Sequence, residues 1–555
     1  MLHADGSLLT IDLSDQEYRA ENIDNILSSY IGGRGVGTKL VHDRVPFDVD
    51  PLSAENRVVF TAGPMQLSNM SFTGRMNATT VSPLTDGILS SNAGGFMSRN
   101  FAATGYSAVE IVGASDDLVV LHVRDDGVKF ESVPELAGKT VPETCEYINE
   151  TWGLGPEHVA CIGPAGENKV RFASVMTTED RAFGRGGVGA VFGSKRVKAV
   201  TFNGNSSPDI EIPPEQMEIH REAASDDNIM KRQGTVAVMD LANEVNGLPS
   251  YYFSEQTFDG VKGINGEAVE EKKYKKGTCS ACAFACKLPT RDDERGIETE
   301  GPEFETAMAF GSNCGIDDIV DVMQSNDRCD RLGLDAISTG NTIAAYLASE
   351  DRFCDQELIL DLIKQIAYRD GIGHLLAEGI SRIHDDLGVE NWSVKGMDFA
   401  AHEGRVLHGQ GLSYAVANRG ADHMYSTFYS VEYPLVSKDE ALPPSGTTGK
   451  ADRLTMQENL MAVNDSGIVC KFSRDYMTPE RYEALFGTDY DELLGVGEKV
   501  IHMERHFNNQ RGFDREDDRL PYDLPNLETA LDEYYERRGW NDDGTVPTSV
   551  IRDFC

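Results

Sequence analysis

The sequence predicts an α+β protein in which a β-rich N-terminal domain with two related halves is followed by two mainly α-helical domains. Three observations support this prediction. Short apolar runs separated by turn residues fill about the first 205 residues, apolar spacings of three and four residues dominate later, and a Pro- and Ser-containing stretch, residues 206–216, separates the two patterns. We place the domains at residues 1–207, 208–410 and 411–555.

The predicted N-terminal strands are short and are bounded by Gly, Pro, Asn and Ser, as in RVVFTAG, AVEIVGA, DLVVLHV and KAVTF. Two pairs of segments recur in this region. GGRGVG (Gly32–Gly37) resembles GRGGVG (Gly184–Gly189), and VVFTAGP, which ends at Pro64, resembles VACIGP, which ends at Pro164. Two similar β-halves folded face to face would explain both pairs, and chance recurrence among 54 glycines is the alternative.

The helical predictions after the linker rest on periodicity. DDIVDVMQSNDRCDRLGLDAIS, TIAAYLAS and QELILDLIKQIAYRD carry apolar residues three and four positions apart, which places them on one helix face. Residues from about 410 to the end are also mainly helical, with loops such as PPSGTTGK.

Composition and charge limit the possible functions. Apolar residues make up 40% of the 555-residue chain, which excludes global disorder. The chain has 51 Lys+Arg and 91 Asp+Glu, a net charge of −40, which argues against binding to nucleic acid or anionic membranes. Mean hydropathy is −0.35, and neither a membrane-spanning run nor a secretory signal is recognisable. We therefore expect a soluble, cytoplasmic protein.

The acidity has three interpretations: an ordinary acidic enzyme, a cation-binding surface, or adaptation to a salty cytoplasm. We favour the halophilic interpretation, because the excess acid is spread along the whole chain rather than held in one tail. At 1 M salt the screening length falls to about 3 Å, which relieves self-repulsion.

Three of the ten cysteines lie close together in GTCSACAFACK, as Cys279, Cys282 and Cys286. Three thiolates at this spacing suit three corners of an iron–sulfur cube, and Cys470 in NDSGIVCKF is the best candidate for the fourth ligand. A zinc site or purely structural cysteines are the alternatives. The reversed order CxxxCxxC, used by radical-SAM enzymes, is absent from this segment.

Several turns combine glycine with arginine or asparagine: GGRGVG, FTGR (Phe72–Arg75), SNAGG (Ser91–Gly95) and RAFGRGG (Arg181–Gly187). Glycine lets backbone N–H groups approach a ligand, and arginine offers a fork for phosphate. Together they indicate a phosphorylated polar cofactor, with ordinary hairpin turns as the alternative.

Carboxylates and one imidazole complete the candidate residues. Asp330, Asp335 and Asp465 are candidates to accept N–H bonds from a pterin ring edge, and a helix cap or a solvated helix face is the alternative for each. GPEFET (Gly301–Thr306) and RGADH (Arg419–His423) provide a carboxylate and an imidazole that are able to act as base and hydrogen-bond donor, although each motif also suits a structural role.

Taken together, these motifs resemble the aldehyde ferredoxin oxidoreductase family, tungsten enzymes that carry two pterin cofactors. The resemblance covers nearly the whole chain. It includes IGGRGVG, GRMNATTVSPLTDG, SNAGGF, IGPAGEN, GRGGVGAVFGSK, the CxxCxxxC motif, CDRLGLDAIS, LLAEG, NRGADH, DSGIVCKF and RGFDREDDRLP.

The resemblance implies a role for each matching residue. The residues matching those that hold the pterin phosphates and a bridging Mg²⁺ are Arg75, Asn92, Gly94, Arg181, Ala182 and Gly184. The pterin-binding acids match Asp330, Asp335 and Asp465, and the 4Fe–4S ligands match Cys279, Cys282, Cys286 and Cys470. The acid–base pair matches Glu305, or its neighbour Glu303, and His423.

The function implied by the resemblance is oxidation of an aldehyde to a carboxylic acid at a tungsten, or less favoured molybdenum, bis-pterin centre. Electrons would pass through a 4Fe–4S cluster to ferredoxin, and the chain would be a possible homodimer. One alternative is a reductase of the same family acting on another substrate, such as an aromatic acyl-CoA. A second is an iron–sulfur electron carrier without the tungsten cofactor.

The chain departs from the family pattern at a few places. DSGIVC stands where DxxGLC is common, Tyr425 stands where some members offer a pterin-binding lysine, and MDFAAHEGR differs from a pattern resembling LPAYDPR. Gln324 stands near the glutamate that, in some members, helps to hold a subunit-bridging metal, so we predict no such bridge.

A run of lysines precedes the first cysteine of the cluster motif, in EKKYKKGTC. The run consists of Lys272, Lys273, Lys275 and Lys276. An acidic ferredoxin would be attracted to such a patch, and a solvated loop is the alternative.

The halophilic interpretation predicts a strong salt dependence of stability. We expect the melting temperature to rise between low and molar KCl, because screening relieves repulsion within a chain of net charge −40. Differential scanning calorimetry across that range tests this, and a melting temperature independent of KCl would contradict it.

Overall fold

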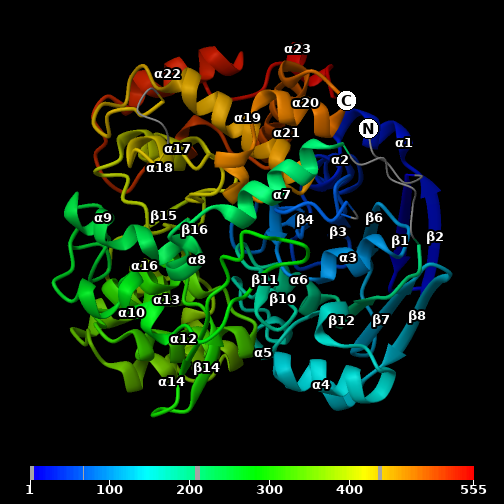
Figure 1. The fold of residues 1–555 in the computed structure, drawn as a ribbon, viewed down its shortest axis with the longest axis horizontal. Helices are drawn as coiled ribbons and strands as arrows, with labels where there is room; N and C mark the ends of the chain where they lie inside the picture. Colours follow the sequence, from blue (N-terminus) through cyan, green and yellow to red (C-terminus); the bar gives the residue numbers. More distant parts are fainter. Residues whose placement is uncertain (1–5, 67, 207–212, 436–439, 555) are drawn as a thin grey trace.

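The computed structural model describes residues 6–66, 68–206, 213–435 and 440–554. Most of the predicted linker, residues 207–212, lies outside the described residues. Figure 1 shows a β-rich N-terminal domain in blue and cyan, a group of helices in green, and a second group in orange and red. The predicted α+β class, with a β-rich domain followed by a mostly helical region, is confirmed.

The N-terminal domain contains two six-stranded sheets. The first has the order β2-β1-β6-β3-β4-β5 and the second β11-β10-β9-β12-β7-β8. Strands of the first are β1 (Ser7–Asp12), β2 (Glu17–Asn22), β3 (Val58–Thr61), β4 (Met76–Val81), β5 (Ile88–Ala93) and β6 (Ala108–Val112). Strands of the second are β7 (Val119–Arg124), β8 (Gly127–Ser132), β9 (Val159–Cys161), β10 (Val175–Thr177), β11 (Arg181–Phe183) and β12 (Val197–Phe202).

The two sheets have the same topology, as the prediction of two related halves requires. In each sheet, the first strand of an antiparallel hairpin pairs in parallel with the last strand of its half, β6 or β12. The other edge of that last strand pairs with an antiparallel meander of three strands, β3–β5 or β9–β11. VVFTAGP and VACIGP lie at equivalent strands, β3 and β9. GGRGVG and GRGGVG do not lie at equivalent places. The first is at the start of α2, between β2 and β3, and the second leads into α6 (Val188–Ser194), between β11 and β12.

The sheets pack against each other through aromatic side chains. Phe60 of β3 lies 5.4 Å from Phe183 of β11 and 6.0 Å from Phe202 of β12, measured between ring centroids. All three rings are fully buried. The core of the N-terminal domain therefore lies between the two sheets.

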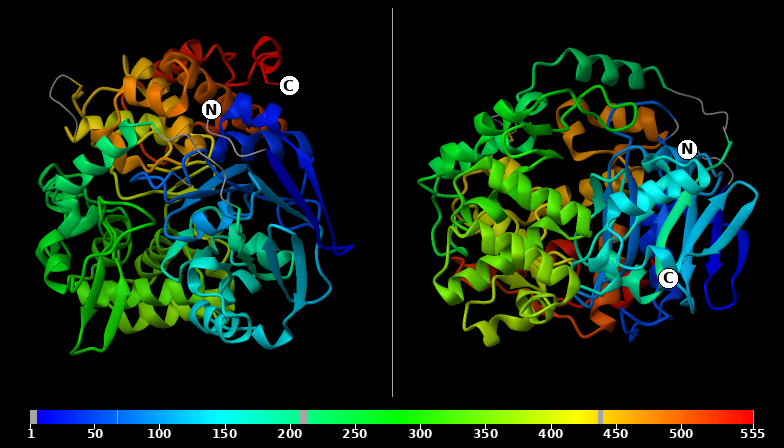
Figure 2. Two further views of the ribbon diagram at one scale, coloured as in Figure 1. Left: turned by 45° about the vertical axis from the view of Figure 1, so that its right-hand side comes forward. Right: turned by 90° about the horizontal axis from the view of Figure 1, so that it is seen from below.

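The remaining chain is mainly helical. In both views of Figure 2, most of its green helices lie on the side away from the blue and cyan strands. The longer helices of the molecule are α2 (Gly33–Arg44), α4 (Val141–Trp152), α7 (Glu215–Ser225), α12 (Ile319–Leu332), α13 (Ala336–Glu350), α14 (Gln356–Tyr368), α16 (Ile380–Leu387), α17 (His408–Val416), α19 (Ala451–Gly467), α20 (Pro479–Phe486), α21 (Tyr490–Gln510) and α22 (Leu527–Arg538). None of the described helices is long and apolar enough to cross a membrane.

Helix α7 follows the predicted linker but packs on the C-terminal helices. Its Ile219 and Ala223 share an apolar cluster with Val463 of α19 and with Tyr482 and Phe486 of α20. The boundary between residues 208–410 and 411–555 stays a prediction. Helix α7 belongs to the first range but packs on helices of the second.

A buried ion pair joins the N-terminal domain to the C-terminal helices. Arg34 of α2 donates from Nε and Nη2 to the two carboxylate oxygens of Glu504 in α21, both at 2.7 Å. The hydroxyl of Tyr425 donates to Glu504 at 2.9 Å, and its ring lies 4.7 Å from the Arg34 guanidinium. Burial alone would lower the pKa of Arg34, yet Glu504 raises it above its ordinary value. Arg34 therefore binds protein carboxylates, and the GGRGVG turn does not offer it to a phosphate.

Glu504→Gln tests the weight of this contact. The substitution leaves the Arg34 charge buried without its main partner, and breaking such a pair costs about 3–5 kcal/mol. We expect a clear fall in the denaturation midpoint measured by circular dichroism. The matched control is Arg295→Met, which breaks the exposed pairs with Asp318 and Asp321 and should cost at most about 1 kcal/mol. Equal effects of the two variants would contradict the central role of the buried pair.

Candidate active site

The four predicted cluster cysteines come from two segments. Cys279, Cys282 and Cys286 lie on the loop between α10 (Gly266–Lys272) and β13 (Pro289–Asp292), and Cys470 directly precedes the 3-10 helix η6 (Lys471–Tyr476). All four are partly buried free thiols. Burial raises the pKa of Cys282 and of Cys286, and Cys470 and Cys279 raise both further, so the four thiols lie within electrostatic reach of one another.

Turns of the N-terminal domain hold both cysteine segments. The backbone N–H of Ser280 donates to the Gly95 carbonyl at 2.9 Å, and that of Cys470 donates to the Phe72 carbonyl at 2.7 Å. Phe72, together with Phe284, belongs to the apolar cluster on which Cys282, Cys286 and Cys470 pack. Four soft thiol donors in an apolar surrounding fit an iron–sulfur cluster.

Arg75 lies between these cysteines and the predicted pterin residues. Its Nη1 atom lies 3.5 Å from the Cys470 sulfur. Burial lowers the pKa of Arg75, but Cys470, Cys279 and Asp465 raise it above its ordinary value. A Cβ added to Gly94 would lie 3.3 Å from the Cys279 sulfur and 4.0 Å from Arg75 Nη1, so glycine leaves space between the cysteine loop and the guanidinium.

Asp465 joins strand β5 to the segment of the fourth cysteine. Its carboxylate accepts a hydrogen bond from Asn92 Nδ2 at 2.6 Å and lies 3.1 Å from Lys471 Nζ. Burial raises the pKa of Asp465, yet Lys471, Arg34 and Arg419 hold it below its usual value. Asp465 is thus an ionised group between Asn92, a residue of the expected cofactor site, and Lys471, which follows the fourth cysteine.

Arg181, Ala182 and Gly184 follow one another along and after the edge strand β11. The guanidinium of Arg181 donates to Glu300 at 2.8 Å and lies 3.7 Å from Glu303. A Cβ on Gly184 would meet only Ala182, at 3.9 Å, so this turn is open. Glu303 therefore pairs with Arg181, whereas Glu305 is the carboxylate that faces His423.

Asp330 and Asp335 have different surroundings. Asp335 caps α13, where it accepts hydrogen bonds from the Ser338 backbone and hydroxyl, and it also lies 3.5 Å from Arg185 Nε. Asp330 accepts from Asn326 at 3.2 Å, and burial raises its pKa well above the usual value. The capping alternative thus applies to Asp335 and not to Asp330, which lies inside α12.

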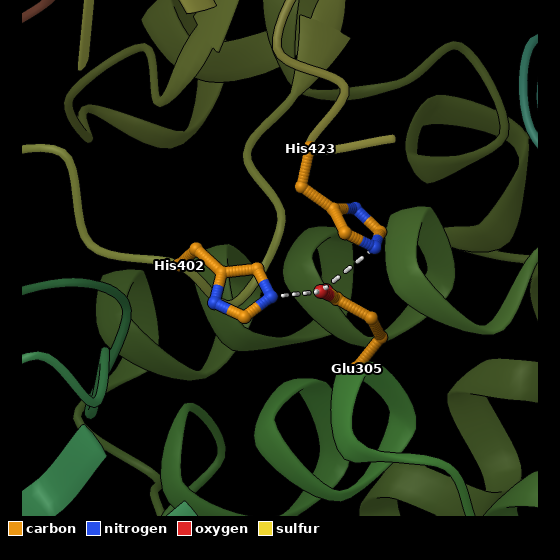
Figure 3. Close-up of side chains that lie close together, drawn as sticks. All are labelled: Glu305, His402 and His423. Atoms are coloured by element: carbon orange, nitrogen blue, oxygen red, sulfur yellow. Dashed lines mark ion pairs between the residues drawn. The ribbon is translucent and has the colours of Figure 1, made fainter. Parts of the chain in front are cut away.

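Glu305 and His423 meet, as predicted, and a third residue joins them (Figure 3). Glu305 lies in α11 (Phe304–Thr306), directly before a π-helical turn, η5 (Ala307–Ser312), a distortion common at functional sites. Its Oε2 accepts the Ala401 backbone N–H at 2.7 Å, while Oε1 lies 3.4 Å from His423 Nε2 and 3.7 Å from His402 Nε2.

The third residue, His402, was not predicted from the sequence. It stacks on Tyr429 with a centroid separation of 3.6 Å and an interplanar angle of 5°. Burial and His423 lower the pKa of His402 well below its usual value, so its imidazole is neutral. Burial raises the pKa of Tyr429 to about 12. The available signal was MDFAAHEGR, the segment that departs from the family pattern and contains His402.

Two further charged residues near this group were also missed. Arg185, in the GRGGVG turn, donates to the Asp398 carbonyl at 2.7 Å. Lys471 follows Cys470 directly, donates to the Met424 carbonyl at 2.6 Å, and has its pKa lowered to about 8 by burial. Lys471 carries no local pattern that distinguishes it from a surface cation, whereas Arg185 belongs to the RAFGRGG turn, in which only Arg181, Ala182 and Gly184 were assigned a role.

The predicted lysine patch is divided. Lys272 is paired with Asp292 at 2.6 Å, and the ammonium of Lys273 donates to the Lys231 carbonyl at 2.7 Å. Lys275 lies over the Tyr274 ring, and it is exposed together with Lys276. Only the second pair of lysines is therefore available to attract an acidic partner.

Comparisons with known proteins match nearly the whole chain to one family. Two family models match: "Aldehyde ferredoxin oxidoreductase, N-terminal domain" over residues 8–204 and "Aldehyde ferredoxin oxidoreductase, domains 2 & 3" over residues 215–554. The chain is 32% identical to the tungsten-containing aldehyde ferredoxin oxidoreductase of Pyrococcus furiosus, covering 99% of this chain and 98% of the relative. It is 33% identical to the Thermococcus kodakarensis enzyme of the same name, covering 98% and 97%.

Two more distant proteins share the whole length of the chain. A Pyrococcus furiosus protein named "Aliphatic sulfonate oxidoreductase, WOR-like subunit" is 25% identical to this chain and covers 99% of this chain and 96% of its own. The active-site complex of benzoyl coenzyme A reductase, solved with 1,5-dienoyl-CoA, has a TM-score of 0.81 at 23% identity, covering 100% of this chain and 97% of that one. At that identity the second comparison establishes the fold alone.

Proposed function

The chain belongs to the aldehyde ferredoxin oxidoreductase family, and from this membership and the site we propose that it oxidises aldehydes to carboxylic acids and passes the electrons to ferredoxin. The observation that carries the proposal is the placement of Glu305. One carboxylate oxygen is fixed by the Ala401 N–H, and the other faces two imidazoles. A positioned base of this kind suits removal of a proton from a reacting carbon centre.

The family implies a tungsten–pterin cofactor, which supplies the two-electron oxidation when bound. We assign its phosphates and a bridging Mg²⁺ to the glycine turns and guanidiniums around Arg75, Asn92, Gly94, Arg181, Ala182 and Gly184. We assign its pterin edges to the carboxylates of Asp330, Asp335 and Asp465. The half-buried guanidinium of Arg75 and the open turn at Gly184 suit an anionic ligand.

In the proposed reaction, each residue of the acid–base group has one task. Overall, water supplies the second oxygen of the acid, and the bound cofactor would take the two electrons. Glu305 Oε1 accepts a proton as the aldehyde C–H bond breaks, while the Ala401 N–H keeps Oε2 in place. His423 Nε2 orients the substrate carbonyl oxygen. His402 is buried and stacks on the half-buried Tyr429, so the two rings cover one side of the group.

For the electrons, we propose a 4Fe–4S cluster held by Cys279, Cys282, Cys286 and Cys470. Cys470 lies five residues after Asp465 in the chain, and Arg75 contacts the Cys470 sulfur. These contacts support a short path from the pterin site to the cluster. Lys275 and Lys276 are the exposed cations that remain near the cysteine loop for an acidic ferredoxin.

Metal and cofactor analysis of the anaerobically purified protein tests the whole proposal. We expect tungsten, iron, fluorescent oxidised pterin after release, and aldehyde-dependent reduction of ferredoxin. Iron without tungsten or pterin would favour a simple electron carrier. Tungsten and pterin with turnover of an aromatic acyl-CoA, and none with aldehydes, would favour the reductase alternative.

Cys282→Ala tests the cluster. Because the cluster needs thiolate ligands, we expect loss of the 4Fe–4S signal in electron paramagnetic resonance and a fall in iron content. The matched control is Cys354→Ala, which removes an exposed free thiol outside the four and should retain the full iron content. A complete cluster in Cys282→Ala would show that the assignment is wrong.

Glu305→Gln tests the proposed base. The variant should keep tungsten and pterin but lose about 10²–10⁴-fold in turnover, the usual contribution of a general base. Glu303→Gln is the comparison from the same motif, since Glu303 faces Arg181 instead. The proposal requires the larger turnover loss from Glu305→Gln, and the opposite order would move the role of the base to Glu303.

A further inference from the structure

Three potential metal-binding atoms converge beside the proposed base. Glu305 Oε1, His402 and His423 each offer one donor atom, and these atoms all lie within 4.8 Å of one another. Among the residues that the structure describes, this is the one His, Cys, Asp or Glu group that is so tightly gathered. The close-up in Figure 3 shows both imidazoles directed at the same carboxylate oxygen.

The spacing is near that of a zinc site. Two ligand atoms at the usual 2.0–2.1 Å from a tetrahedral Zn²⁺ lie about 3.3 Å apart. Oε1 of Glu305 lies 3.4 Å from His423 Nε2 and 3.7 Å from His402 Nε2. Small rotations of the two side chains would therefore bring both nitrogens and the oxygen to coordination distance.

The carboxylate oxygen at the centre of this group has no hydrogen bond to any described residue. Glu305 Oε1 is buried and finds no hydrogen-bond partner within the described chain, although Oε2 is fixed by Ala401. His402 is nearly fully buried, at 3% exposure, and it is held by its stack on Tyr429. A bound cation would satisfy a buried oxygen that has no hydrogen-bond donor within the described chain.

From this geometry we propose that Glu305, His402 and His423 form a binding site for Zn²⁺, and that its occupation stops turnover. Two histidines and a glutamate with a fourth position open is a ligand set known from zinc sites. The inhibition rests on the proposed function, because the ion would take the lone pair of the base and the nitrogen that orients the carbonyl. The binding itself does not depend on which substrate the enzyme uses.

The test uses the purified holoenzyme and graded free Zn²⁺ under a metal buffer. Zinc, iron and tungsten are measured per chain after equilibrium dialysis, and aldehyde turnover is measured in parallel. We expect one zinc per chain, unchanged iron and tungsten, loss of turnover with the same zinc dependence, and recovery on adding a chelator. Zinc gained only as iron is lost would assign it to the cysteines and overturn the proposal.

Variants locate the ion. Loss of even a supporting contact to a metal ligand costs about 10–100-fold in affinity, so His402→Gln should weaken zinc binding at least that much. Glu305→Gln should also weaken zinc binding. The amount of zinc bound per chain measures this effect even though the turnover of the variant is low. The matched control is His502→Gln, a buried histidine of α21 that packs against Trp540 and should bind zinc as the parent does.

Two results would overturn the proposal. One is a parent enzyme that takes up no zinc at concentrations that leave iron unchanged. The other is equal zinc affinity in the parent, His402→Gln and Glu305→Gln. Failure of the proposed function would instead appear as absent aldehyde turnover before zinc is added, with zinc binding still measurable.

Discussion

The candidate site depends on one buried carboxylate, that of Asp465. It accepts a hydrogen bond from Asn92 in β5, lies 3.5 Å from Arg34 in α2, and pairs with Lys471 directly after Cys470. A buried carboxylate is unfavourable unless it is paired and hydrogen-bonded, so these contacts hold the N-terminal sheet, α2 and the cysteine segment in one arrangement. The expected cofactor and cluster sites meet at that point.

A second constraint places positive charge inside a strongly acidic protein. The net charge is −40, yet Arg75, Arg181 and Arg185 are gathered at the site, and carboxylates or cysteines raise the pKa of each above its usual value despite burial. Because these charges are at least partly buried, dissolved salt weakens their interactions less than it weakens those of surface charges. The interior therefore suits an anionic cofactor, whereas the surface repels polyanions such as nucleic acids.

The acid–base group illustrates how the loop around residues 399–405 contributes twice. The backbone of Ala401 fixes one oxygen of Glu305, and the side chain of His402 faces the other. A single segment thus orients the base and adds a third donor beside it. The same geometry explains both the proposed proton removal and the proposed sensitivity to Zn²⁺, because a positioned lone pair serves a proton or a cation.

The sequence by itself determined the α+β class and the paired N-terminal halves, because periodicity, turn residues and recurring motifs are local properties of the chain. The pairing of Glu305 with His423 was expected from the family resemblance alone. Only the tertiary structure decided that His402 joins Glu305, that Arg34 pairs with Glu504 rather than a phosphate, that the two similar glycine motifs are not equivalent, and that Lys272 and Lys273 leave the basic patch. The physical reason is that the partner of a charged side chain is set by which distant segments meet in space, and no spacing within one segment records that meeting.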